Sequence, residues 1–238
     1  PSVQENQAGY HRFAQDVGAR YLYQVGNTGQ QIDWSLDPVA LVSAEMPFPE
    51  GATAIRYHQE MDMTAYPNAA PEQADRSLVV SFLNLFDRID YQDNYTEFRR
   101  AMELGDFAFE VYGHEQEDGF LTPVHAIGAR MASAGWGWHD KPVGDGFGHV
   151  VHAWAAVGRP LVGHAEYYRG KMAEPLWRDG ETCLDLGARS LKETVALIHE
   201  IAADPDRHAE MCRAIRAEFD RLVDYEAEAD AVRRLLGL

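Results

Sequence analysis

Three glycines stand close together where the chain is expected to turn into a helix. Gly144, Gly146 and Gly148 would let the backbone approach a ligand closely, because glycine has no side chain in the way. A helix beginning directly after them would offer N–H groups and a partial positive charge, which suits a phosphate. Lys141 could add a full positive charge. The pattern predicts either a phosphate site or a structural turn in which Asp145 caps the helix.

Four histidines are expected near the same rim of the fold: His139, His149, His152 and His164. His149 and His152 are three residues apart, so they share one face of the expected helix. That spacing allows a metal site, polar contacts with sugar or phosphate oxygens, or plain packing. No second carboxylate stands at ligand spacing on this helix and the sequence lacks H-x-x-x-H, which disfavours the metal.

Signatures of several other enzyme classes are missing. The sequence has neither a G-x-S-x-G nucleophile elbow nor a G-x-x-x-x-G-K-[ST] phosphate loop. After Phe82 the chain reads Asn84–Leu85–Phe86–Asp87, where a dehydrogenase would carry its glycine-rich dinucleotide turn. These absences count against hydride transfer and against the common hydrolase and NTPase motifs.

The elements that must position these residues follow an alternating pattern. Short apolar strands are expected at 78–83, 107–112, 135–139, 160–164 and 182–186, and helices at 91–104, 121–133, 147–157 and 168–178. Such alternation predicts an α/β fold, a doubly wound parallel sheet over residues 77–188. Ligands of such sheets bind beyond the carboxyl ends of the strands, which is where the glycine turn and the histidines fall.

The flanking segments differ from this central unit. Residues 1–66 predict a partial α/β domain, with one helix near 7–17 and strands at 19–25, 39–43 and 54–58, and residues 67–76 read as a linker. Residues 189–238 predict helices that pack on the central domain. The helix starts are marked by a capping box at Ser190 and Glu193 and by the pair Asp204–Pro205, and a last helix is expected at 225–236.

Composition limits the partners. The 238 residues are 46% hydrophobic and 25% charged, as in an ordinary globular protein. The net charge of −17 makes nucleic acid and anionic membrane surfaces poor partners. No apolar run approaches the roughly 18 residues that span a bilayer. Cys183 and Cys212 are too few for a disulfide framework and predict buried reduced thiols and a cytoplasmic protein, and a homo-oligomer is compatible with the sequence.

Residues 145–186 resemble the C-terminal domain of GT-B glycosyltransferases, above all the large retaining group that uses nucleotide-activated sugars. The matching parts, in order, are Asp145–Gly146–Phe147–Gly148, Gly158–Arg159–Pro160, Leu161–Val162 and Asp179–Gly180–Glu181–Thr182–Cys183. The resemblance implies two Rossmann-like domains with a cleft between them, a nucleoside-diphosphate sugar as donor, and no required metal or other cofactor. It implies that Asp145 is the catalytic residue facing the donor sugar, and that the backbone at Phe147, Gly148 and His149 faces the diphosphate.

Two departures from the family pattern stand out. The second acidic residue of the family, which holds the nucleotide ribose, is replaced here by Ala153, and His149 or His152 could substitute for it. The family's basic pair after the first strand of this domain has only Asp87–Arg88 as a counterpart, so Lys141 or Lys171 is expected to supply the charge. His164, after the fourth strand, is a further candidate for substrate binding.

Three functions therefore stay open at this stage. The first is retaining transfer of a sugar from a nucleoside-diphosphate sugar to an unknown acceptor. The second is a non-catalytic protein of the same fold that binds a nucleotide or glycan, which Ala153 would favour. The third is a histidine-rich, metal-dependent hydrolase.

Overall fold

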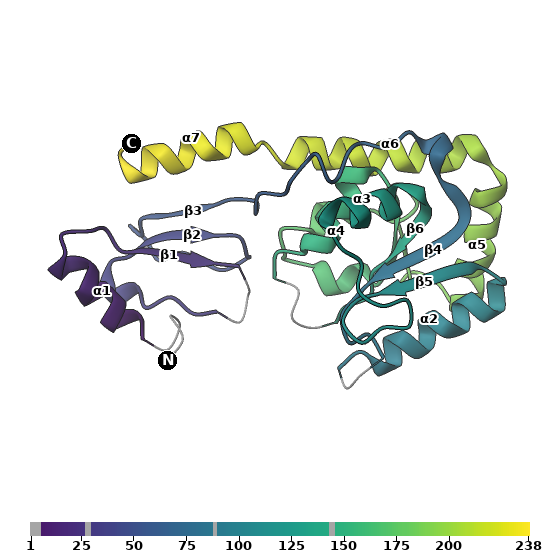
Figure 1. Ribbon diagram of the computed structural model, residues 1–238, viewed down its shortest axis with the longest axis horizontal. Coiled ribbons are helices and arrows are strands. Elements are labelled where there is room, and N and C mark those ends of the chain that lie inside the picture. The colour runs from purple at the N-terminus through teal and green to yellow at the C-terminus, as the bar shows by residue number, and fades with distance from the viewer. Residues whose placement is uncertain (1–5, 27–29, 88–89, 143–145) are drawn as a thin grey trace.

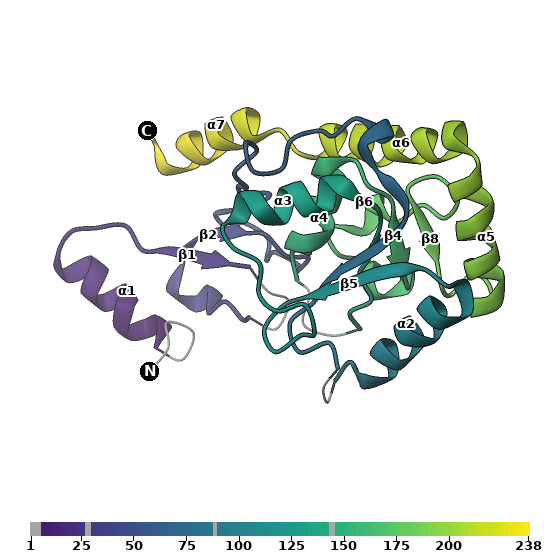
Figure 2. The same cartoon turned by 45° about the vertical axis from the view of Figure 1, so that its right-hand side comes forward.

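The computed structural model describes residues 6–26, 30–87, 90–142 and 146–238, which form two lobes (Figure 1). The first lobe holds a three-stranded sheet and the second a five-stranded sheet. A long segment after the first sheet leads into the second lobe, and the chain's last helix returns to the first (Figures 1 and 2). Both sheets are parallel, so the predicted α/β class is confirmed.

The first lobe is small and contains a short parallel sheet. Its elements are α1 (Gln7–Asp16), β1 (Leu22–Val25), β2 (Val39–Val42) and β3 (Ala54–Arg56), with the strands in the order β1-β2-β3. Alternate residues of β1 and β2 point inward, so Tyr23 and Val25 pack with Ala40 and Val42 in a core of their own. The sequence predicted this helix and these three strands.

The second lobe is built on five parallel strands. They are β4 (Asp75–Phe82), β5 (Ala108–Tyr112), β6 (Ala134–Trp138), β7 (Leu161–Gly163) and β8 (Cys183–Asp185), in the order β5-β4-β6-β7-β8. From β4 the chain goes to one neighbour, β5, and then crosses back to the other side of β4 to form β6. The carboxyl ends of β4 and β6 therefore border the point where the strand order reverses, the preferred ligand site of such sheets.

Helices cover both faces of this sheet. Val79 of β4 packs with α2 (Gln92–Gly105) and α5 (Leu191–Ala203), while Leu78 and Val80 pack with α3 (Val124–Ser133) and α4 (His149–Val157). Side chains of a strand alternate between its faces, which explains this division. The helix α6 (Pro205–Leu222) packs against α4. The sheet is thus doubly wound, as predicted.

The central strand β6 is wholly buried, and its sequence explains how it fits. Trp136 and Trp138 point to one face, and Gly137 between them leaves the other face bare. A Cβ on Gly137 would stand 2.5 Å from the ring of Trp154, so the glycine lets α4 lie close to the sheet. This close packing holds the middle of α4 against the sheet.

The prediction of one helix at 168–178 is wrong. The structure has two short 3₁₀ helices there, η3 (Ala165–Tyr168) and η4 (Glu174–Leu176). Gly170 between them has a left-handed φ of +72°, and Pro175 lacks the N–H that an α-helix interior needs. The apolar residues whose spacing predicted a helix are buried, but Tyr168 belongs to the first of these turns and Leu176 to the second.

The expected linker, residues 67–76, is packed onto the second lobe. It contains a 3₁₀ helix, η2 (Pro71–Gln73), and the first residues of β4. The N–H of Ala69 donates to the carbonyl of Val157 at 3.1 Å, and the fully buried Arg159 donates to the carbonyls of Ala69 and Ala70. These bonds fix the segment that joins the two lobes.

The last helix, α7 (Tyr225–Leu236), crosses back to the first lobe, which corrects the expectation that all of residues 189–238 pack on the central domain. Glu228 forms an ion pair with His58, with 2.6 Å between carboxylate and Nδ1, and also accepts from the backbone N–H of His58. The hydroxyl of Tyr225 donates to the carbonyl of Gln59. The helix α6 ends at Val223, whose extended backbone angles separate it from α7.

None of the helices in the described part of the chain has both the length and the apolar character that a membrane span requires.

Candidate functional site

A cavity of about 190 Å³ lies beyond the carboxyl end of β4, one of the two strands between which the strand order reverses. It is bordered by the carboxyl ends of β4 and β5, by α3, and by the first turns of α4. Its lining residues are Tyr66, Phe82, Asn84, Tyr112, Gly113, Phe120, Leu121, Ile127, Met131, His149, Val150 and Ala153. The start of a helix and a mostly apolar wall thus face the same space.

The strand ends that form one wall are held in place by close contacts. The ring of Phe82 stacks on that of Tyr112, with 5.3 Å between centroids. The amide of Asn84 accepts a hydrogen bond from the N–H of His114 at 2.7 Å. A Cβ on Gly113 would lie 2.9 Å from the carbonyl of Leu83, so only glycine allows this approach of β5 to β4. The wall is therefore largely preformed.

The glycine turn is described from Gly146 onward, while Gly144 and the predicted catalytic residue Asp145 lie outside the described residues. Phe147 is buried and its ring stacks on that of His152 at 4.2 Å. Gly148 has a left-handed φ of +78° directly before α4, a conformation that favours glycine. The turn is thus anchored by its own aromatic residue and leads directly into the helix.

The two histidines of α4 have different surroundings. His149 is exposed and lines the cavity together with Val150 and Ala153. His152 is fully buried, and its Nδ1 lies 2.9 Å from the carbonyl of Gly148. The structure therefore brings His149 to the cavity and places His152 beneath the turn, so the two do not converge on one metal ion.

The predicted cations lie away from this cavity's lining. The ammonium of Lys171 stands over the ring of Tyr168, 5.3 Å from its centroid. Lys171 also borders a cavity of about 470 Å³ between the lobes, together with Glu45 and His58. Lys141 is half-buried directly after Asp140.

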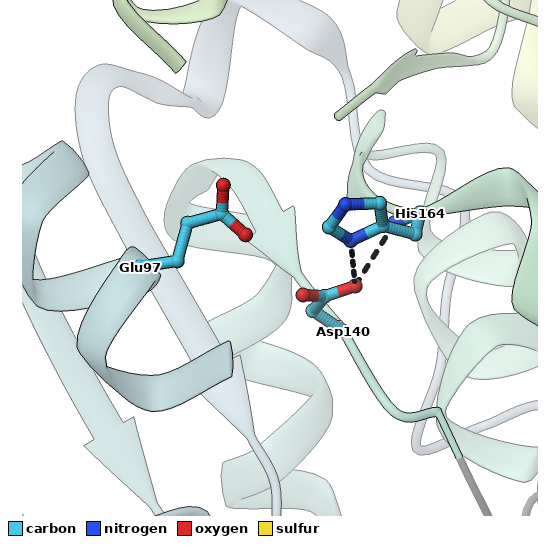
Figure 3. A group of neighbouring side chains, drawn as sticks. All are labelled: Glu97, Asp140 and His164. Carbon is cyan, nitrogen blue, oxygen red and sulfur yellow. Dashed lines mark hydrogen bonds and ion pairs between the residues drawn. The ribbon is translucent and has the colours of Figure 1, made fainter. Parts of the chain in front are cut away.

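His164 belongs to a second group on the α2 side of the strand ends. Asp140 follows β6, His164 follows β7, and Glu97 comes from α2 (Figure 3). Asp140 is fully buried, and its Oδ1 accepts from both the backbone N–H of His164 at 3.0 Å and its Nδ1 at 2.9 Å. Its Oδ2 accepts from the amide of Asn94 at 2.6 Å. One ligand atom from each of Glu97, Asp140 and His164 lies within 4.8 Å of the other two, which is a spacing that can hold a metal ion.

The charges in this group shift the pKa values of His164 and Glu97. The hydrogen bond to Asp140 raises the pKa of His164 above its usual value, against the opposing effect of burial. Burial raises the pKa of Glu97, and the charge of Asp140 raises it further, while His164 and Arg100 lower it. The group therefore favours the positively charged form of the imidazole.

Sequence reasoning found part of this second group. It named His164 after the fourth strand, and His139 and Lys141, which flank Asp140, after the third, because the carboxyl ends of neighbouring parallel strands meet at one edge. It missed Glu97 and Asn94, whose orientation depends on how α2 packs on the sheet. It also missed the aromatic and apolar wall of the first cavity, since nothing local marks such residues as lining.

Comparison with known proteins agrees on the fold. No family model matches the sequence, and no curated protein matches it. Anabaena HepE in complex with UDP and glucose is similar in structure, with a TM-score of 0.64 and 13% identity over 98% of this chain and 76% of HepE. Sucrose-phosphate synthase from Thermosynechococcus elongatus gives a TM-score of 0.67 and 13% identity over 97% of this chain and 71% of the synthase.

TarM gives a TM-score of 0.63 and 11% identity over 91% of this chain, which spans 50% of TarM. At such low identities these likenesses establish the architecture alone. The chain therefore has the fold of the GT-B glycosyltransferases.

Proposed function

We propose that this protein transfers a sugar, with retention of configuration, from a nucleoside-diphosphate sugar to an acceptor. The observation that carries the proposal is the cavity beyond the carboxyl ends of β4 and β5, since the first turn of α4 lines it. A helix start favours anionic groups such as a diphosphate. HepE, which is similar in structure, was solved with UDP and with UDP-glucose.

The cavity wall suits a nucleobase. Phe82, Tyr112, Ile127 and Met131 offer aromatic and apolar surface of the kind that flat rings contact, and Asn84 adds a polar group at the rim. The base would lie against this wall, and the diphosphate would lie toward His149 at the start of α4.

The remaining roles follow from this placement. Asp145 is proposed to orient the donor sugar, with Gly146, Phe147, Gly148 and His149 forming the diphosphate-binding turn. Lys141 and Lys171 are proposed to stabilise the leaving diphosphate, because its charge must be neutralised in the transition state. His152 would support this turn from beneath, through its contacts with Phe147 and Gly148. The donor is the cosubstrate, and the acceptor is a separate molecule.

The test is a panel of nucleotide sugars added to the full chain. A ligand held at about one hundred times its dissociation constant should stabilise the fold by about 2.7 kcal/mol, visible as a higher Tm. The substitution Ala153→Leu, which would fill the cavity, should abolish that shift, while the exposed Ala129→Leu on α3 should retain it. If no UDP-, GDP- or ADP-sugar raises the Tm of the wild-type protein, the proposal is wrong.

Catalysis is tested separately from binding. Release of nucleoside diphosphate or transfer to an acceptor should be lost in Asp145→Ala, which should still bind the donor. The second candidate, a non-catalytic binding protein, is favoured by Ala153, because a methyl group cannot hold the ribose. It expects the same Tm shift with no turnover of any donor, so a measured transfer would exclude it.

A cytoplasmic location is also proposed, because both cysteines are free thiols. Cys183 and Cys212 are both free and buried, as the sequence predicted. Burial raises the pKa of Cys212 to about 11, so this thiol stays protonated and unreactive at neutral pH. Fluorescence of a tagged full-length chain in the source cells would test the location, and a signal in the cell envelope would contradict it.

A further inference from the structure

We propose that Glu97 and His164 bind one divalent transition-metal ion, with Asp140 holding the imidazole of His164 in its ligating orientation. This site lies on the α2 side of the strand ends and shares no lining residue with the cavity proposed for the nucleotide. It is a binding property of its own, and it is tested with the metal alone.

The geometry around His164 is that of a metal-ligating histidine. Its Nδ1 lies 2.9 Å from the buried Oδ1 of Asp140, and its backbone N–H is held by the same oxygen. When Nδ1 donates to a carboxylate, Nε2 of the neutral ring carries the lone pair and its direction is fixed. Figure 3 shows the carboxylate of Glu97 turned toward the ring of His164 from the opposite element, α2.

Asp140 is best suited to this supporting role. Both of its oxygens already accept hydrogen bonds, Oδ1 from His164 and Oδ2 from Asn94. Glu97 differs, because none of the described residues forms a hydrogen bond or an ion pair with its half-buried carboxylate. Glu97 and the Nε2 of His164 are therefore the direct ligands available.

The surroundings supply the remaining requirements of a cation site. The group borders a cavity of about 620 Å³ whose described lining is Asp90, Gln92, Asp93, Asn94, Glu97, Pro142, His164 and Tyr167. This lining includes three carboxylates and neither lysine nor arginine, so it attracts cations. The space leaves room for water molecules to complete the coordination of an ion.

A metal ion at Nε2 of His164 would compete with protons for that nitrogen, as metal ions do at histidine sites generally. The donor set decides which ions bind well. One imidazole nitrogen with a carboxylate favours first-row transition ions such as Mn²⁺ and Zn²⁺ over Mg²⁺ and Ca²⁺, which prefer oxygen ligands alone.

The experiment measures binding of Mn²⁺ to the full chain by calorimetry and by the loss of the free-ion paramagnetic resonance signal. The wild-type protein should bind about one ion per chain, Zn²⁺ should displace it, and an equal concentration of Mg²⁺ or Ca²⁺ should not. Glu97→Gln and His164→Gln should each weaken binding by at least about tenfold. The matched control is Glu103→Gln, an exposed residue of the same helix, which removes the same charge and should bind as the wild type does.

One further variant tests the role of Asp140, and one spectrum of the wild-type chain tests the site even if the variants misfold. Asp140→Asn should weaken binding by about 10–100-fold through the orientation of His164. If these variants unfold, the wild-type chain labelled with ¹⁵N-histidine still decides the matter, because Mn²⁺ should broaden the ring signal of His164 first. Absence of Mn²⁺ and Zn²⁺ binding, unchanged binding in both ligand variants, or broadening confined to other histidines overturns the proposal. None of these outcomes bears on the Tm shifts with nucleotide sugars.

Discussion

The guanidinium of Arg159 joins three segments of the second lobe. It is fully buried and donates to the carbonyls of Ala69 and Ala70, before β4, and of Ala132, in α3. Replacing it by methionine would leave these carbonyls without their donors. We expect Arg159→Met to lower the free energy of unfolding by about 3 kcal/mol or more, measured by urea denaturation. Arg213→Met, an exposed change on α6, should cost less than about 0.5 kcal/mol, and equal losses would contradict this role.

Glu218 should make stability depend on pH. This buried carboxylate bonds to Arg221, which lowers its pKa, and lies 3.1 Å from Arg178. Because the pKa is lower in the folded state, its contribution is present above the unfolded value of about 4.3 and is lost as pH falls toward the folded value. We expect Glu218→Gln to cost about 1–2 kcal/mol in urea denaturation at about pH 7 and much less at about pH 3. A cost that does not change with pH would show that charge is not the reason.

At the scale of elements, Gly128 allows α3 to lie against the segment that follows the first lobe. A Cβ at this position would stand 1.7 Å from the carbonyl oxygen of Ala65, too close for any side chain. Tyr66, the next residue, lines the proposed nucleotide cavity. We expect Gly128→Ala to destabilise the fold by about 1–3 kcal/mol and to weaken the Tm shift with the donor.

The control is Ala129→Ser on the exposed face of α3, which should change both quantities little. Measurements are a urea titration and the Tm with and without the best nucleotide sugar. If Gly128→Ala is as stable as the control, α3 does not need a glycine to lie against Ala65, and the proposed role of Gly128 is wrong.

Most helix starts and the strands of both lobes could be predicted, because their signals are local. The capping box at Ser190 and Glu193 forms both of its hydrogen bonds, and Asp204 caps α6 as expected. The periodicity around Tyr168 and Leu176 was also local, but it could not show that Gly170 and Pro175 divide the segment. The spacing of apolar residues indicates which positions are buried, and two buried turns can produce the same spacing as one helix.

The site was predicted at the correct edge of the sheet and only partly in its residues. Strand ends of a parallel sheet meet at one edge, so the positions of Asp140, His149 and His164 near that edge follow from the strand assignments. The side on which each residue lies depends on packing. For this reason the burial of His152 under Phe147 and the approach of Glu97 from α2 could not be read from spacing.

At the scale of the molecule, α7 connects the far end of the chain to the turn before α4. Glu228 on α7 pairs with His58, whose ring lies 6.1 Å from that of Phe147 and 5.5 Å from that of His152, measured between centroids. The same histidine thus contacts the returning helix and the residues that anchor the glycine turn. The position of the first lobe relative to the turn should therefore depend on this pair.

We expect Glu228→Ala to loosen both sides of this contact. Without its partner carboxylate His58 loses an ion pair and a backbone hydrogen bond, so amide hydrogen exchange should quicken in β3 and in residues 146–153. Asp230→Ala is the matched control, because Asp230 pairs only with the exposed Arg233 among the residues described and such pairs contribute little. Exchange measured by mass spectrometry should separate the two variants. Equal exchange in both would mean that the interface between the lobes, and not this ion pair, holds His58 against Phe147.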